Sequence, residues 1–135
     1  MANDSMTFPP AIRYSTEHLW LRVEGDTGWA GVTDYAQDQL GEIVYVKLPE
    51  VGEKVTFMKR MGDIESLKII SELFSPASGD VLEVNASLEV TPEIINTDPY
   101  CEGWLVRVRM TSPAEAATLL DSAAYAELVS IRPAK

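Results

Sequence analysis

Most of the chain consists of short runs of apolar and β-branched residues, separated by Gly, Pro, Asn and Asp at close spacing. Apolar and polar positions alternate most clearly where Val106 and Val108 are interspersed with Arg107 and Arg109. This pattern is typical of a barrel or sandwich of antiparallel strands. It predicts strands at Leu19–Glu24, Trp29–Val32, Ile43–Lys47, Lys54–Met58, Asp63–Lys68, Ile69–Phe74, Val81–Asn85 and Trp104–Met110.

A short helix is predicted to interrupt the strands at Asp34–Leu40. Thr33 is suited to be its N-cap, because a threonine hydroxyl can accept a hydrogen bond from an N–H of the first turn. Asp34 places a negative charge at the positive end of the helix dipole, and Gly41 supplies a stop. The local signals therefore mark both ends of this helix.

A second helical region is predicted near the C-terminus. Ser112 is suited to be an N-cap, Pro113 occupies the first helical position, and Glu115 follows three residues after the cap, which is the capping-box pattern. The segment Ser122–Leu128 then predicts a further helical turn or two. The expected fold is therefore mainly β, with one short internal helix and a C-terminal helix.

The length of 135 residues favours a single domain over residues 1–135, with residues 1–12 and 130–135 as flexible tails. Apolar residues make up 46% of the chain and charged residues 24%, which is ordinary for a globular protein and unlike a disordered one. No linker or low-complexity stretch indicates a domain boundary. We expect one body with its own core.

The chain is acidic, with 21 Asp and Glu against 11 Lys and Arg and a formal charge of −10. Such a charge repels phosphate backbones and anionic lipids, so neither nucleic-acid binding nor membrane binding is expected. No apolar run is long enough to span a bilayer, and Cys101 is the single cysteine, so no internal disulfide can form. These features predict a cytoplasmic protein. One His and one Cys also provide no cluster for a transition metal.

The segment with the most informative chemistry runs from Ile64 to Asp80 and reads as strand, Lys68, strand and turn. A lysine between β-forming and acidic residues usually belongs to a charged solvent face. Composition alone therefore assigns Lys68 no function.

The motifs ESLKII and SPASG in this segment resemble the lipoylation site of the glycine cleavage H-protein family, which reads Glu-Ser-Val-Lys-Ala followed by Ser-Pro-x-Ser-Gly. Other stretches of the chain follow the family in the same order, namely YSTEHLW, GVTDYAQDQLGEIVYVKLPEVG, EVN and INTDPYCEGW. The resemblance as a whole spans roughly residues 14–128. Because these motifs agree in both identity and spacing, chance does not explain them.

This resemblance implies a hybrid barrel-sandwich of antiparallel strands, with lipoate amide-linked to Lys68 at a hairpin tip. Glu65 and Ser66 would then serve recognition by the lipoate-attaching enzyme, and Glu72 would lie near a cleft for the lipoyl arm. The chain itself would be a carrier without catalytic residues, since the cofactor supplies the reactive group and the protein supplies orientation and docking.

The family role also implies a set of partners. Glycine decarboxylase loads an aminomethyl group onto the arm, aminomethyltransferase removes it, and dihydrolipoamide dehydrogenase reoxidises the dithiol. A carrier that visits several enzymes in turn is expected to make weak, transient contacts with each of them. We expect it to be a monomer.

The sequence departs from the family at one position that bears on the arm cleft. The family usually has His-Glu-Trp near its start, and that glutamate helps to hold the aminomethylated arm; here the triplet is His18-Leu19-Trp20. If this segment is extended, Glu17 and Leu19 point to the same face, so Glu17 can reach part of the same space. Glu17 and His18 therefore join Glu72 as candidates for the cleft.

Alternatives remain open. Some H-like proteins carry lipoate for sulfur oxidation beside a heterodisulfide-reductase-like complex, and Leu19 favours this reading. A biotinyl carrier is disfavoured, because biotin sites place methionine on both sides of the lysine, where this chain has Leu67 and Ile69. A catalytic Schiff-base lysine requires a desolvated pocket, which a hairpin tip does not supply.

Overall fold

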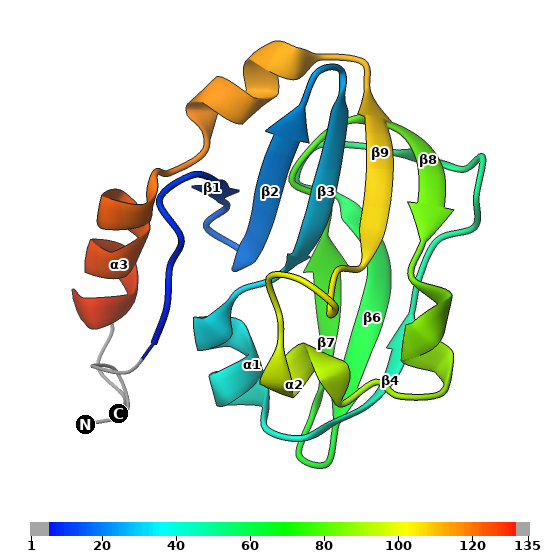
Figure 1. Ribbon diagram of the computed structural model, residues 1–135, viewed down its shortest axis with the longest axis vertical. Coiled ribbons are helices and arrows are strands. Elements are labelled where there is room, and N and C mark those ends of the chain that lie inside the picture. Colours follow the sequence, from blue (N-terminus) through cyan, green and yellow to red (C-terminus); the bar gives the residue numbers. More distant parts are fainter. Residues whose placement is uncertain (1–5, 132–135) are drawn as a thin grey trace.

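Two antiparallel sheets form the body of the protein in the computed structural model, which describes residues 6–131 (Figure 1). The six-stranded sheet has the order β1-β2-β3-β9-β8-β5, and the three-stranded sheet has the order β4-β6-β7. Every pairing between these strands is antiparallel. The strands are β1 (Arg13–Tyr14), β2 (Leu19–Glu24), β3 (Thr27–Val32), β4 (Ile43–Lys47), β5 (Lys54–Val55), β6 (Arg60–Ser66), β7 (Ile70–Phe74), β8 (Gly79–Val84) and β9 (Val106–Met110).

The helices are short and lie around the sheets (Figure 1). None of those in residues 6–131 is long and apolar enough to cross a membrane. They are the α-helices α1 (Asp34–Leu40), α2 (Ile94–Thr97) and α3 (Ser122–Ile131) and the 3-10 helices η2 (Ala86–Glu89) and η3 (Pro113–Thr118).

The mainly β prediction is confirmed, and α1 has the predicted ends. The Thr33 side chain accepts a hydrogen bond from the Ala36 N–H, and the Gly41 N–H donates to the Gln37 carbonyl. Gly41 has a φ of +84°, a backbone conformation that favours glycine. The predicted strand Lys54–Met58 is wrong in length, because pairing ends at Val55 and the chain then turns.

The capping box predicted for the second helical region is also wrong. Ser112 makes no side-chain cap hydrogen bond, and the segment after it is a 3-10 helix. Glu115 instead accepts hydrogen bonds from the Ser78 N–H and hydroxyl, both at 2.8 Å. The Glu115 carboxylate therefore binds Ser78, which is distant in sequence, and not the start of the helix as the local pattern predicted. The C-terminal helix prediction is confirmed by α3.

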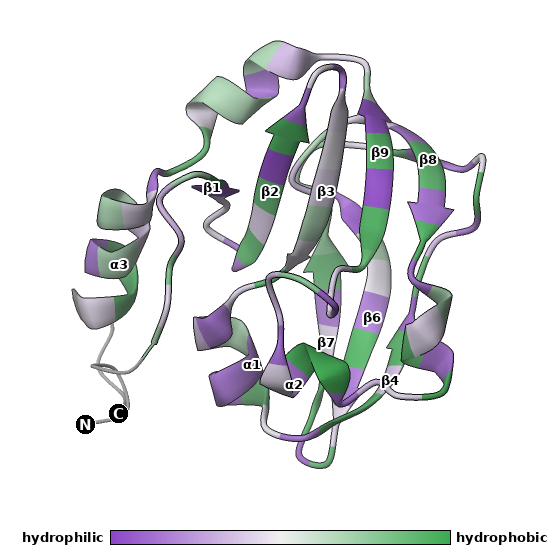
Figure 2. Cartoon of the chain, viewed as in Figure 1, coloured by the Kyte–Doolittle hydropathy of each residue, from purple (hydrophilic) through white to green (hydrophobic). Residues whose placement is uncertain are grey.

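The main core lies between the two sheets. Side chains alternate between the two faces of a strand, so each sheet turns one apolar face toward the other sheet. Leu21 and Val108 from the larger sheet pack in one apolar cluster with Ile64 and Leu73 from the smaller one. Figure 2 shows the corresponding alternation of hydrophobic and hydrophilic positions along β8 and β9. This core fixes the side of β6 and β7 that faces solvent.

A second apolar cluster joins the N-terminal segment to α3. Tyr14 and Tyr125 are fully buried and their rings stack at a centroid distance of 4.8 Å. Phe8 packs edge-on against both rings, and Ile12 is buried. Residues 1–5 and 132–135 lie outside the described residues, so the predicted flexibility of the two ends stays a prediction.

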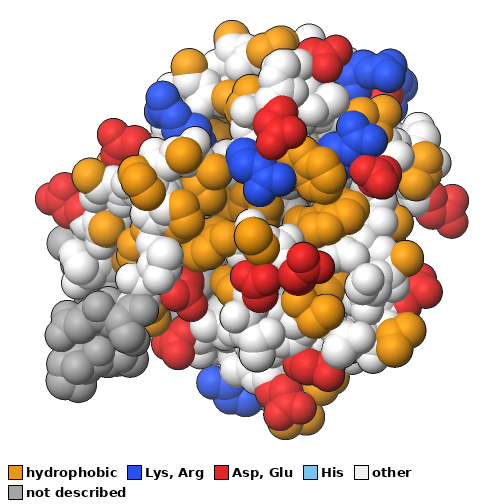
Figure 3. All heavy atoms as spheres, in the orientation of Figure 1, with side chains coloured by type: hydrophobic (Ala, Val, Ile, Leu, Met, Phe, Trp, Pro, Cys, Tyr) orange, Lys and Arg blue, Asp and Glu red, His pale blue; other side chains and the backbone are white. Residues whose placement is uncertain are grey.

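The outer face of the larger sheet carries many of the basic side chains. Arg22 and Arg107 lie over the Trp29 ring, at 5.3 and 5.4 Å from its centroid. Each arginine also pairs with a glutamate, Arg22 with Glu24 and Arg107 with Glu83. Figure 3 shows the basic side chains mostly over these strands, in the upper half of the view, while acidic ones are spread more widely. Neighbouring carboxylates thus offset the positive charge on this face.

Tyr14 makes the stability of the fold depend on pH in the alkaline range. Burial is the main cause that raises the pKa of the Tyr14 hydroxyl, and Tyr125 adds to it; burial also raises the pKa of Tyr100. The folded state favours the neutral Tyr14 hydroxyl. The stability that Tyr14 contributes is therefore complete below the pKa of a tyrosine in the unfolded chain, about 10, and is lost as the pH rises above that value.

We expect Tyr14→Phe to reduce the alkaline loss of stability. Urea unfolding between pH 8.5 and about 11.5 should show the free energy of unfolding falling less steeply than in the unchanged chain, by up to ~1 kcal/mol per pH unit. Tyr14→Phe/Tyr100→Phe should flatten the curve further. An unchanged slope in the single variant would contradict this assignment.

Candidate functional site

The β6–β7 hairpin has a tip whose shape is set by Ser66. The Ser66 N–H donates to the Ile69 carbonyl at 2.9 Å. Its hydroxyl oxygen accepts from the N–H groups of Lys68 and Ile69, at 3.1 and 3.2 Å. Ser66 is 9% exposed, so these bonds form at the edge of the core. The serine predicted as a recognition residue thus also shapes the turn.

Lys68 lies at this tip and is exposed. The tip is tied to the connection between α1 and β4, because the Leu67 N–H donates to the Glu42 carbonyl at 3.0 Å. The Lys68 side chain runs past Gly41, where an added Cβ would lie 3.1 Å from its Cε. Figure 1 shows this connection passing beside the hairpin. Lys68 makes no ion pair with the described residues 6–131.

Apolar side chains surround Lys68 on the surface. Leu67, Ile69 and Ile70 are 72%, 50% and 69% exposed. In the smaller sheet, Glu65 lies between Tyr45 of β4 and Ile70 of β7 in one cross-strand row. The predicted recognition residue Glu65 is therefore a half-buried carboxylate in an apolar setting, next to the tip.

A cavity of about 210 Å³ opens next to the hairpin. Its apolar part is lined by core residues from both sheets and from α1, and its polar part by side chains from the turn before β2, from α1 and from β7. Leu40 and Ile69, the chain neighbours of Gly41 and Lys68, both line it, so the lysine lies at its margin. The lining residues are Glu17, His18, Leu19, Val32, Tyr35, Ala36, Gln39, Leu40, Ile64, Ile69, Ser71, Glu72 and Leu73.

The segment before β2 is a turn and not the extended chain that we considered for Glu17. The Ser15 N–H donates to the Leu19 carbonyl at 2.8 Å, and His18 has a φ of +72°. Glu17 and Leu19 nevertheless line the same cavity. Leu19 is 2% exposed and belongs to the core, whereas Glu17 is exposed, so the carboxylate is at the rim and the leucine at the base.

His18 is held against α3. Its Nδ1 lies 2.8 Å from the Tyr125 hydroxyl, which is also 2.8 Å from the Thr33 hydroxyl. Thr33 is the N-cap of α1, so this buried network joins α3, α1 and the turn that carries Glu17. The C-terminal helix thereby fixes one wall of the cavity, a role that the sequence did not reveal.

Glu72 remains accessible at the rim of the cavity. Arg60 donates to both oxygens of Asp63, at 3.1 and 2.6 Å, and this contact holds the pKa of Asp63 below its usual value. The distance from Arg60 to Glu72 is 3.8 Å, so that contact is weaker. No lysine or arginine is among the described residues that line the cavity. Apart from Lys68 at the margin, the carboxylates of Glu17 and Glu72 thus make the rim acidic, which suits a neutral or cationic guest.

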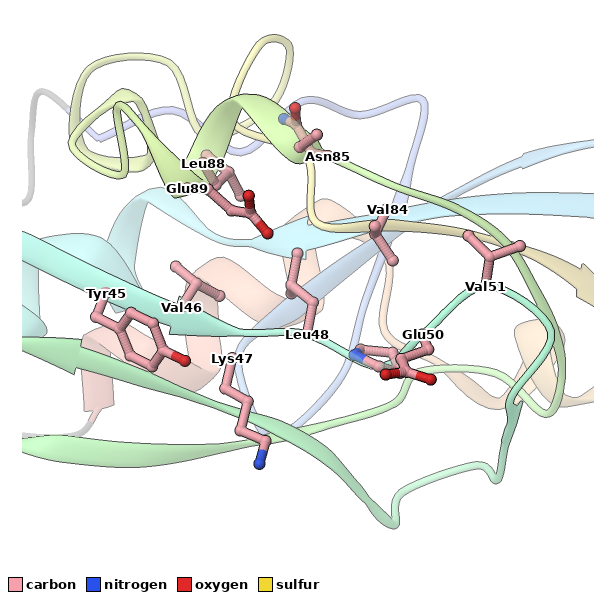
Figure 4. A pocket seen from close by; sticks show the side chains of 12 residues that line it. Tyr45, Val46, Lys47, Leu48, Glu50, Val51, Val84, Asn85, Leu88 and Glu89 are labelled. Carbon is pink, nitrogen blue, oxygen red and sulfur yellow. The ribbon is translucent and has the colours of Figure 1, made fainter.

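A larger groove of about 630 Å³ lies elsewhere, between β4 with its following loop and the end of β8 with η2 (Figure 4). Val46, Leu48 and Val84 form apolar walls, with Lys47 and Glu89 among its charged residues. None of the residues lining it belongs to β6 or β7. This groove is separate from the cavity beside Lys68.

The six residues predicted for the site thus form two adjoining groups. Lys68, Glu65 and Ser66 lie on the hairpin, and Glu17, His18 and Glu72 line the cavity. Within residues 6–131 no group of His, Cys, Asp and Glu side chains is arranged to hold a metal ion. The sequence missed the cavity residues Tyr35 and Gln39 of α1, which no local motif distinguishes from other helix positions.

A β-sandwich that presents an exposed lysine on a hydrogen-bonded hairpin tip, beside a lined cavity, has the architecture expected of a carrier domain. The Glycine cleavage H-protein family matches residues 12–131. The chain belongs to this family and is a non-catalytic lipoyl carrier.

Individual relatives agree with this assignment. A glycine cleavage system H protein from Symbiobacterium thermophilum is 52% identical over 117 residues, covering 87% of this chain and 91% of its own length. One from Bacteroides thetaiotaomicron is 48% identical over 125 residues, covering 93% and 99%. The crystal structure of the Mycobacterium marinum H protein aligns with a TM-score of 0.84 at 37% identity, covering 91% of this chain and 99% of that chain. These relatives give no support to the sulfur-oxidation alternative.

We expect Ser66→Ala to loosen the hairpin tip without unfolding the protein. The change removes the acceptor for the Lys68 and Ile69 N–H groups, a loss of ~1 kcal/mol, so these amides should exchange with solvent about fivefold faster. Hydrogen exchange followed by NMR measures this, with the β9 amides as an internal reference. Exchange that rises equally at the tip and in β9 would instead indicate global destabilisation.

Proposed function

We propose that Lys68 carries the lipoyl group in amide linkage to Nζ, and that the 210 Å³ cavity receives the arm between visits to partner enzymes. The observation that carries this proposal is the placement of one exposed lysine, on a tip fixed by Ser66, at the margin of an apolar cavity with an acidic rim. When bound, the lipoyl group supplies a disulfide that accepts and releases the one-carbon unit of glycine.

The cavity suits an alkyl arm and its load. Leu19, Ile64 and Leu73 offer apolar surface, which favours burial of hydrocarbon. Glu17 and Glu72 place carboxylates where a protonated amine would receive charge-assisted hydrogen bonds. These two residues therefore take the role that the family assigns to the glutamate at the position of Leu19.

The carboxylates of Glu17 and Glu72 weaken the argument for the sulfur-carrier alternative. That alternative depended on the loss of a carboxylate at position 19, whereas Glu17 and Glu72 supply two carboxylates to the same cavity. The three relatives named above are all glycine cleavage system H proteins.

The partners that we propose are the lipoate-attaching enzyme, glycine decarboxylase, aminomethyltransferase and dihydrolipoamide dehydrogenase. Glu65 and Ser66 are proposed to contribute to recognition by the first of these, since both adjoin Lys68. Contacts with each partner are transient, and the carrier works as a monomer. We place it in the cytoplasm, where the single Cys101 remains a thiol.

We expect Lys68→Arg to abolish lipoylation while leaving the fold intact, because arginine keeps the charge but lacks the amine that is acylated. Intact and peptide mass spectrometry after incubation with lipoate, ATP and a lipoate–protein ligase measures the result. Lys59→Arg, a change of the same kind at another position, should be modified normally. Lipoate found on Lys47, Lys54, Lys59 or Lys135 in the Lys68→Arg chain would overturn the assignment.

We expect Glu17→Gln/Glu72→Gln to weaken protection of the loaded arm. Loss of the charge-assisted contacts should let the lipoylated, glycine-loaded chain release its load to water about fivefold faster, for ~1 kcal/mol lost at a partly exposed site. Ammonia release after removal of glycine decarboxylase measures this. Glu89→Gln, which changes a carboxylate of the separate groove, serves as the control. Equal rates in the double variant and the control would exclude the role of the two carboxylates.

A further inference from the structure

Asn96 of α2 uses both ends of its side chain to hold the connection between α1 and β4. Its Nδ2 donates to the Gly41 carbonyl at 2.8 Å and to the Gln37 Oε1 at 3.0 Å. Its Oδ1 accepts from the Ile43 N–H at 2.9 Å. One half-buried amide therefore spans the connection from the end of α1 to the start of β4.

This connection is the surface against which Lys68 lies. The Glu42 carbonyl accepts from the Leu67 N–H, and Gly41 leaves room for the lysine, whose Cε would be 3.1 Å from a Cβ at that position. The backbone bonded by Asn96 is thus the backbone that contacts both the residue before the lysine and the stem of the lysine itself.

The helix α2, which carries Asn96, is itself held in place by packing. Ile95, next to Asn96, is fully buried in the main core. Gly103 packs so closely on α2 that an added Cβ would be 2.8 Å from the Asp98 carbonyl and 3.1 Å from the Ile95 Cα. Asn96 therefore links the core to the connection that lies against Lys68.

We propose that Asn96 is a positioning residue for Lys68: by fixing Gly41 and Ile43, it fixes the direction in which the lysine stem leaves the hairpin. A fixed stem presents Nζ to the lipoate-attaching enzyme at a smaller entropic cost. This inference rests on the proposed function in that it takes Lys68 as the modified residue.

The chain contains a matched control for Asn96. Asn85 makes the same kinds of bonds at η2: its Nδ2 donates to the carbonyls of Glu102 and Trp104, both at 2.8 Å, and its Oδ1 accepts from the Ser87 N–H at 3.2 Å. Asn85 lines the separate groove of Figure 4 and not the cavity beside Lys68. Replacing either asparagine removes similar hydrogen bonds, but only Asn96 bonds the connection under Lys68.

The test compares Asn96→Ala with Asn85→Ala at a temperature where both are fully folded. The first readout is the rate of lipoate transfer to Lys68 by a lipoate–protein ligase with lipoate and ATP. The second is ¹³C relaxation of the Lys68 Cε methylene in the unmodified chain. We expect Asn96→Ala to lower kcat/KM about fivefold, for ~1 kcal/mol of lost positioning, and to raise the mobility of Cε. Asn85→Ala should change both readouts much less, because the Asn85 amide donates only to the residues on either side of Gly103 and not to the connection under Lys68.

Equal transfer rates and equal Cε relaxation in the two variants would overturn the role of Asn96. If Asn96→Ala does not fold, Asn96→Asp replaces it, because aspartate keeps the acceptor for Ile43 and loses both donors. If the unchanged chain takes no lipoate on Lys68, the proposed function fails, while the relaxation comparison still decides whether Asn96 positions the lysine.

Discussion

The backbone hydrogen bond between the Leu67 N–H and the Glu42 carbonyl joins the hairpin tip to the connection between α1 and β4. A lysine that carries a cofactor must be exposed enough to be modified, yet its backbone must be held in place. Ser66 meets the second requirement from within the hairpin, and the bond to Glu42 meets it from outside. Lys68 is therefore exposed on a tip that is held from two directions.

The cavity depends on the same arrangement at longer range. Its walls come from the turn before β2, from α1 and from the β6–β7 hairpin, and both sheets must pack correctly before these walls meet. Tyr125 of α3 adds a constraint, because it bonds both His18 and Thr33. The proposed arm site is thus built by the whole fold, although Lys68 lies in one hairpin.

Local signals predicted the parts of this structure that local physics controls. Thr33 and Gly41 marked both ends of α1, and alternation located most strands, because caps, turns and pleats depend on neighbouring residues. The Ser112 capping box failed because Glu115 bonds Ser78, which is distant in sequence.

Lys68 was proposed as the attachment site from its motif, and this stays a prediction, whereas the surroundings of Lys68 were only partly predictable. Glu17 was placed by assuming an extended segment; the segment is a turn, and the carboxylate still reaches the cavity. Asn96 lies in the family motif INTDPYCEGW, but that motif did not indicate its partners, which lie on residues 37–43, far from it in the sequence. Contacts of this kind become visible only once the chain is folded.

We propose that this chain carries the one-carbon unit of glycine on Lys68. The most direct measurement incubates the lipoylated chain with glycine and glycine decarboxylase and locates the added mass by peptide mass spectrometry. We expect a lipoyl-linked aminomethyl adduct confined to the peptide that contains Lys68. A fully lipoylated chain that gains no adduct while a related H protein does so under the same conditions would contradict the account.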